Sequence, residues 1–176
     1  MNDCLFFGRN DFVVLDENEP EKITKPIQFK FENENENENE KQIKQISSKN
    51  IQKVTVGEEN ENILTIEGNV FAKGRNINPK IQNEFINISS LIEDTNDRII
   101  EDVVSGNNSI YLLSSNQNAY GIGSNHYDQL GFDYETLEET EKPILMMKNV
   151  SKIFSGNTSN HVFLLNSKSR IIWMWI

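Results

Sequence analysis

The sequence has little of the residue types that cross-link small domains. Of its 176 residues one is cysteine, Cys4, and two are histidine, His126 and His161. A single cysteine cannot form an internal disulfide, and neither histidine has a cysteine or carboxylate at metal-ligand spacing. Stability must therefore come from packing and hydrogen bonds rather than from disulfides or a zinc site.

The chain also lacks long apolar runs and clusters of basic residues. Its longest apolar run, Ile171 to Ile176, is far shorter than the roughly 20 residues that span a bilayer. The 17 Lys and Arg residues are outnumbered by 27 Asp and Glu residues, and the net charge is -10. An acidic surface repels phosphate groups, so we expect no direct binding to nucleic acid or membrane. Because the first residues lack the pattern of a signal peptide, we expect an intracellular protein, cytoplasmic or nuclear.

Catalytic motifs are absent from the sequence as well. Gly121 and Gly123 form a lone Gly-x-Gly that lacks the third glycine of a nucleotide-binding fingerprint. There is no P-loop, nucleophile elbow or pair of catalytic carboxylates. We therefore predict no enzyme, no cofactor, and no catalytic or metal-binding residue.

What the sequence does contain is a repeat of about 50 residues. Gly57, Gly106 and Gly156 are 49 and 50 residues apart, and Gly74 and Gly123 each follow the first glycine of their copy by 17 residues. Between them lie short apolar runs bounded by Gly, Asn and Ser, a pattern that predicts β-strands joined by tight turns. A small sheet of this kind cannot bury both faces alone and must stack on its copies.

This period, with several strands in each copy, predicts the blades of a β-propeller. Kelch repeats have a similar length but usually carry a Gly-Gly doublet, and WD repeats are shorter and usually carry Trp-Asp; the chain has neither. We expect the repeated glycines where the chain turns sharply or where neighbouring blades approach closely.

Several segments resemble the repeat of the regulator-of-chromosome-condensation (RCC1) family. Residues 123–131 match its Gly-x-Asn-x-x-x-Gln-Leu-Gly motif, with Asp128 where the family prefers glycine. Residues 8–15 match a variant of that motif. The strand-end glycine of the family follows Val104-Ser105 and Phe154-Ser155, and the family histidine corresponds to His161.

The resemblance implies an all-β fold, a partial β-propeller of about three antiparallel blades that is incomplete relative to the family's seven-bladed ring. It makes residues 1–176 one partial RCC1-type repeat domain. The structural repeat positions it implies are Gly8, Asn10, Gly57, Gly74, Asn76, Gly106, Gly123, Asn125, Gln129, Leu130, Gly131, Gly156 and His161.

Two acidic stretches interrupt the repeats. Residues 32–49 are a low-complexity insertion that begins with alternating Glu and Asn; its self-repelling charge and lack of an apolar period predict disorder. A milder stretch, Glu135 to Glu141, is expected to be a loop.

Three hypotheses about function follow. Propellers present loops that recruit other proteins, so the first is a protein–protein interaction scaffold, whose acidic loops suit polar or basic partners. The resemblance implies the second, a part of a guanine-nucleotide exchange factor for a small GTPase. The third is a truncated or degenerate fragment without independent activity. Pairing of partial rings, each supplying the other's missing blades, is an alternative to truncation.

Overall fold

The computed structural model describes residues 5–9, 22–28, 50–74, 85–168 and 170–174, and these form antiparallel sheets. Asn10, Asn76 and the predicted insertion at 32–49 lie outside the described residues. The most N-terminal sheet pairs β1 (Leu5–Arg9) with β2 (Lys22–Gln28).

Three further sheets follow, which we call the first, middle and third blades. The first blade contains β3 (Ile51–Val56), β4 (Asn60–Thr65), β5 (Val70–Gly74) and β6 (Ile86–Asn87). The middle blade contains β7 (Ile100–Ser105), β8 (Ser109–Ser114), β9 (Asn118–Ser124) and β10 (Glu139–Lys148). The third blade contains β11 (Val150–Ser155), β12 (Val162–Asn166) and β13 (Ile171–Met174).

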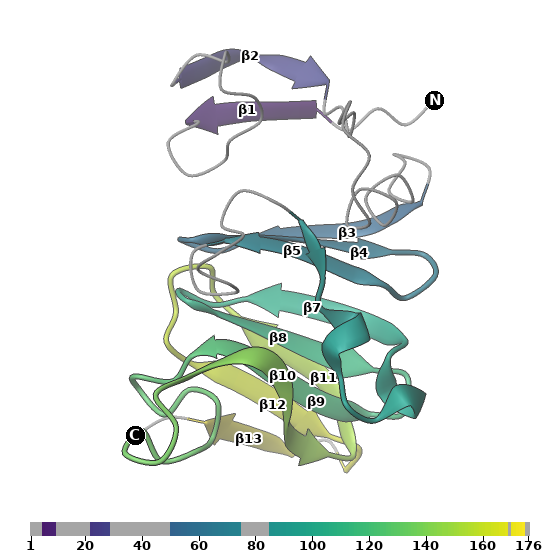
Figure 1. The fold of residues 1–176 in the computed structure, drawn as a ribbon, viewed down its shortest axis with the longest axis vertical. Helices are drawn as coiled ribbons and strands as arrows, with labels where there is room; N and C mark the ends of the chain where they lie inside the picture. Colours follow the sequence, from purple (N-terminus) through teal and green to yellow (C-terminus); the bar gives the residue numbers. More distant parts are fainter. Residues whose placement is uncertain (1–4, 10–21, 29–49, 75–84, 169, 175–176) are drawn as a thin grey trace.

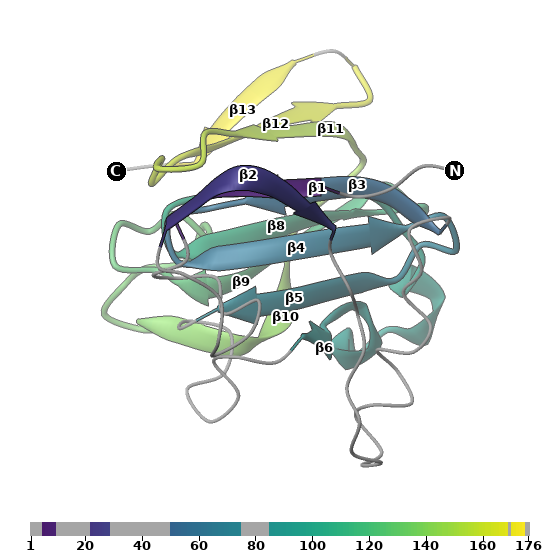
Figure 2. The same ribbon diagram turned by 90° about the horizontal axis from the view of Figure 1, so that it is seen from above.

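The sheets are stacked in chain order along the long axis of the molecule, from β1–β2 to the third blade (Figure 1). Seen from above, the first blade lies over the middle one, and the third blade is fanned toward one side (Figure 2). Strands pair with their neighbours in sequence, as expected of blades built from consecutive hairpins. The all-β fold of stacked antiparallel blades is therefore confirmed.

The core lies between the blades, and β8 shows why. All six of its residues are buried, although successive side chains in a strand point to opposite faces. Ile110 and Leu112 pack into a cluster shared with Leu64 and other residues of the first blade. Tyr111 and Leu113 pack into a second cluster with the third blade. The middle blade is thus covered on both faces, which is the stacking that the repeat predicted.

Two features between β5 and the end of the middle blade differ from the sequence-based expectations. Short 3₁₀ turns form at Ser89–Leu91 (η1) and Thr95–Asp97 (η2), in a segment for which we predicted no regular structure. The expected loop at Glu135 to Glu141 is wrong in its second half, because β10 begins at Glu139. This edge strand tolerates Pro143 because its pairing with β9 is irregular between Thr140 and Ile144.

Candidate functional site

The segment after β9 folds around the side chain of Asn125. This fully buried amide donates to the carbonyl oxygens of Phe132 (2.8 Å) and Leu137 (2.7 Å), and its Oδ1 accepts from the backbone N–H of Leu130 (2.8 Å). Leu130 is thereby placed in the cluster between the middle and third blades. The asparagine of the repeat motif acts here as an internal support for the loop.

Gln129 ties the same loop to the start of β8. Its Oε1 accepts from the backbone N–H of Tyr127 (2.8 Å), and its Nε2 donates to Ser109 Oγ at 3.3 Å. Asp128, which replaces the family's glycine, has φ = 50°, and Gly131 has φ = 78°. Aspartate is among the residues that tolerate the left-handed region, so the turn keeps its shape despite the substitution.

The remaining predicted repeat positions lie at strand ends. Gly8 lies in β1, and His161 immediately precedes β12. Gly74 ends β5 with φ = 152°, and Gly123 lies near the end of β9 with φ = 106°. In each blade, one glycine of the 50-residue period directly follows the first strand: Gly57 after β3, Gly106 after β7 and Gly156 after β11.

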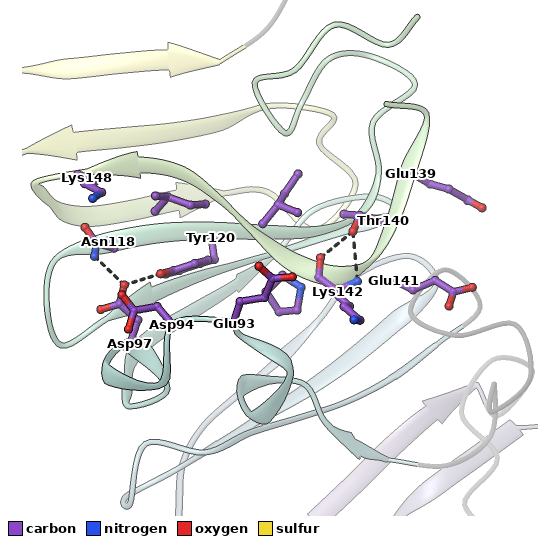
Figure 3. Close-up of a pocket in the computed structure, with 13 residues that line it drawn as sticks. Glu93, Asp94, Asp97, Asn118, Tyr120, Glu139, Thr140, Glu141, Lys142 and Lys148 are labelled. Atoms are coloured by element: carbon purple, nitrogen blue, oxygen red, sulfur yellow. Dashed lines mark hydrogen bonds between the residues drawn. The ribbon is translucent and has the colours of Figure 1, made fainter. Parts of the chain in front are cut away.

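A cleft of about 690 Å³ opens at the edge of the middle blade formed by β10, between β10 and the segment that carries η2. Asp94, Asp97 and Asn118 lie together at one end of it, and Glu139, Thr140 and Glu141 at the other (Figure 3). The residues that line it are Glu93, Asp94, Asp97, Asn118, Tyr120, Glu139, Thr140, Glu141, Lys142, Pro143, Ile144, Leu145 and Lys148.

The carboxylate of Asp97 joins the η2 turn to the β8–β9 hairpin. Its side chain is 2% exposed and accepts four hydrogen bonds from the hairpin. The donors are Ser114 Oγ (3.2 Å), Asn116 Nδ2 (2.9 Å), Asn118 Nδ2 (2.6 Å) and the Tyr120 hydroxyl. Since every donor comes from one hairpin, this one side chain fixes the η2 wall of the cleft to the β8–β9 hairpin.

These contacts shift the protonation equilibria of both partners. Burial alone would raise the pKa of Asp97, but the hydrogen bonds from Tyr120, Asn118, Asn116 and Ser114 outweigh it and hold that pKa below its ordinary value. Burial, and then the neighbouring Asp97 carboxylate, raise the pKa of the Tyr120 phenol. Asp97 therefore stays ionised and Tyr120 neutral at physiological pH, so this pair is a structural contact.

The rim of the cleft carries the charge that a ligand would meet. Glu93, Asp94, Glu139 and Glu141 are exposed carboxylates, against two exposed lysines, Lys142 and Lys148. Nowhere in the described part of the chain do three or more His, Cys, Asp or Glu side chains gather so as to hold a metal ion. The arrangement is suited to binding positively charged groups by electrostatic attraction.

No protein-family model and no curated protein matches the chain in sequence. Solved structures do match it in fold. Human WBSCR16 superposes with a TM-score of 0.72 at 16% identity, over 94% of this chain and 40% of that one. Prp20p from Saccharomyces cerevisiae, described with its binding properties to Gsp1p and histones, gives 0.68 at 14% identity, over 99% and 41%. Yeast RCC1 (Prp20) bound to Kap60 gives 0.58 at 18% identity, over 87% and 32%. The chain has the fold of an RCC1-type β-propeller.

As a partial RCC1-type propeller, the chain spans about 40% of the length of WBSCR16 and Prp20p. At these identities the likeness establishes the fold alone. The described residues contain no helix with the length and apolarity needed to cross a membrane.

Sequence reasoning found the motif at 123–131 of this RCC1-type fold but missed the cleft. The available signal was local: Ser114, Asn116, Asn118 and Tyr120 are polar groups at every second position around the β8–β9 turn. Side chains two apart along a strand share a face, as Asn118 and Tyr120 do in β9, so polar groups at this spacing can have a common partner. Nothing in the sequence identified Asp97, seventeen residues before Ser114, as that partner.

Proposed function

We propose that the chain is a protein-interaction scaffold whose cleft binds a positively charged segment of a partner protein. The observation that carries this proposal is the cleft of about 690 Å³ with four exposed carboxylates and two lysines in its lining. The blades beneath it supply a fixed surface, and loops held on a rigid scaffold are common binding elements.

Charge supports the choice of partner. The whole chain carries -10, so the field around it attracts cationic segments before contact, and the excess carboxylates in the cleft favour them once bound. Prp20p, which shares the fold, is described as binding histones as well as Gsp1p, and histones are basic proteins. A scaffold of this kind needs no cofactor, and we place it inside the cell, in the cytoplasm or nucleus.

A basic peptide should bind the cleft and lose affinity when its carboxylates are neutralised. We expect a fluorescent Lys-rich peptide to bind at low salt and its Glu-rich counterpart not to bind, as measured by fluorescence anisotropy. The Glu93→Gln/Glu141→Gln variant should bind about threefold to tenfold more weakly, because exposed charge pairs contribute about 0.2–1 kcal/mol each. Binding should also weaken with salt, as the Debye length falls to about 8 Å at physiological ionic strength.

The matched control is Glu58→Gln/Glu67→Gln, which removes the same charge from exposed positions outside the cleft lining. This variant should change the affinity less than twofold. Equal losses in both variants would mean that the peptide responds to net charge alone, and the cleft would then have no part in binding.

Guanine-nucleotide exchange on a small GTPase is a second candidate function. The supporting observation is the fold shared with Prp20p, which is described as binding Gsp1p. If the chain has this activity, it should accelerate release of a fluorescent guanine nucleotide from a Ran-type GTPase at least tenfold. Unchanged release at saturating protein would reject exchange by this chain and leave the scaffold proposal in place. Absence of both peptide binding and exchange would favour a fragment without independent activity.

A further inference from the structure

The loop between β9 and β10, residues 125–138, presents exposed aromatic rings. Tyr127 is 58% exposed and Phe132 is 37% exposed. The ring of Tyr134 lies 5.2 Å from that of His126, measured between centroids. An acidic residue directly follows each of Tyr127, Phe132 and Tyr134 in the sequence: Asp128, Asp133 and Glu135. Tyrosine and phenylalanine are enriched in protein interfaces, so exposed rings on one loop indicate a contact surface.

The loop lies at one end of the blades, together with the turns that follow β3, β7 and β11. A Cβ on Gly57 would lie 2.5 Å from the carbonyl oxygen of Gly106, and Asn107 donates its backbone N–H to the carbonyl of Ser159. The backbone N–H of Ser124, just before the loop, donates to the carbonyl of Asn108 in the turn after β7. Turns of three blades and the 125–138 loop therefore share this end.

The charges at this end have one sign. Within the described residues, these turns and the loop contain no Lys or Arg, and their carboxylates are Glu58, Glu59, Asp128, Asp133, Glu135 and Glu138. The hairpin turns at the opposite end carry Lys168 and Arg170 as well as Glu67. A cationic partner is therefore attracted to the end that carries the aromatic loop.

Hydrogen bonds to the backbone hold the two exposed rings in place. The side-chain amide of Asn125 donates to the carbonyl oxygen of Phe132 (2.8 Å), and Gln129 Oε1 accepts from the backbone N–H of Tyr127 (2.8 Å). Both side chains that make these bonds are buried. A loop that is ordered before binding avoids the entropy cost of becoming ordered in the complex.

Two of the neighbouring carboxylates are oriented by the same loop. Asp128 Oδ1 accepts from the backbone N–H of Tyr134, and Asp133 Oδ1 accepts from that of Glu135 at 2.8 Å. Each of these bonds uses Oδ1. An ionised carboxylate has two accepting oxygens, so Oδ2 of each can accept from a ligand.

We propose that the 125–138 loop binds an arginine-bearing segment of a partner protein. The carboxylates select a cation, and the aromatic rings beside them select guanidinium over ammonium. A planar guanidinium stacks on an aromatic face while its N–H groups donate to a carboxylate, whereas the compact lysine ammonium is suited to neither geometry as well. This surface is separate from the cleft, whose lining begins at Glu139 in this part of the chain.

Arginine preference is the property that tests the loop. Fluorescence anisotropy on the full 176-residue chain compares a fluorescent Arg/Ser peptide with a Lys/Ser peptide of the same length and charge. We expect the Arg/Ser peptide to bind about threefold to tenfold more tightly. The Tyr127→Leu/Phe132→Leu variant should bring this ratio to about one, because leucine is apolar but has no aromatic face. Tyr127→Leu alone, at the more exposed ring, should give an intermediate ratio.

The matched control is Tyr127→Phe, which keeps the aromatic face and should keep the ratio of the parent. The cleft variant Glu93→Gln/Glu141→Gln should weaken both peptides alike and leave the ratio unchanged, so the loop and the cleft are tested separately. Equal affinity of the parent for the two peptides would overturn the proposal. So would an arginine preference that persists in Tyr127→Leu/Phe132→Leu, or a parent that binds neither peptide.

Discussion

Replacing Gly123 with alanine is expected to lower the free energy of unfolding by about 3–5 kcal/mol, a large share of the stability of a small domain. Gly123 has φ = 106°, where an L side chain is strained, and its new Cβ would lie 2.4 Å from the carbonyl oxygen of Asn108. That oxygen belongs to the backbone and accepts the N–H of Ser124 (2.9 Å), so it cannot move away without breaking a hydrogen bond. Urea unfolding followed by circular dichroism measures the loss.

Gly156→Ala is the matched control for this prediction. Among the described residues its new Cβ would meet only Ser159 Cβ, at an ordinary contact distance of 3.5 Å. Alanine restricts the unfolded chain more than glycine does, so this variant should lie within about 1 kcal/mol of the parent, in either direction. Similar losses for the two variants would mean that glycine at position 123 serves no steric purpose.

The blades could be predicted from the sequence because their signals are local and repeated. The strand-end glycine, the apolar run of β8 and the turn at 123–131 each report on a few neighbouring residues, and a 50-residue period then requires like sheets to stack. The buried Asn125 shows how local these signals are, because its hydrogen-bond partners lie within twelve residues along the chain.

The cleft could not be predicted, because its walls meet only in three dimensions. Asp97 lies in a stretch with no apolar period, and its partners are on a hairpin 17 to 23 residues later. β10 was misread for a related reason: its acidic beginning and Pro143 resemble a loop, yet β9 offers an edge with which an irregular strand can pair. Local composition here favoured a loop, and the sheet edge determined the outcome.

Replacing Asp97 with alanine is expected to cost about 3–5 kcal/mol, because it leaves more than one buried donor without an acceptor, at about 1–3 kcal/mol for each. The change leaves the Ser114 and Tyr120 hydroxyls, both buried, without the acceptor that they share. Tyr120→Phe should cost less, about 1–2 kcal/mol, because it removes one donor and leaves the other three in place. If the two changes act through the same contact, the double variant should be more stable than additivity predicts.

The fall in stability at low pH gives an independent test of the role of the Asp97 carboxylate. The pKa of Asp97 is below its ordinary value in the folded chain, so the unfolded chain binds the proton more readily. Its contribution is therefore complete above the unfolded pKa of about 3.9 and is lost as the pH falls through the lower folded value. Asp97→Asn should flatten the fall in melting temperature below about pH 4, whereas Asp133→Asn, at an exposed aspartate, should keep the parent's slope. An unchanged slope in Asp97→Asn would show that the four donors do not favour the charged carboxylate, and that the wall of the cleft is held by packing instead.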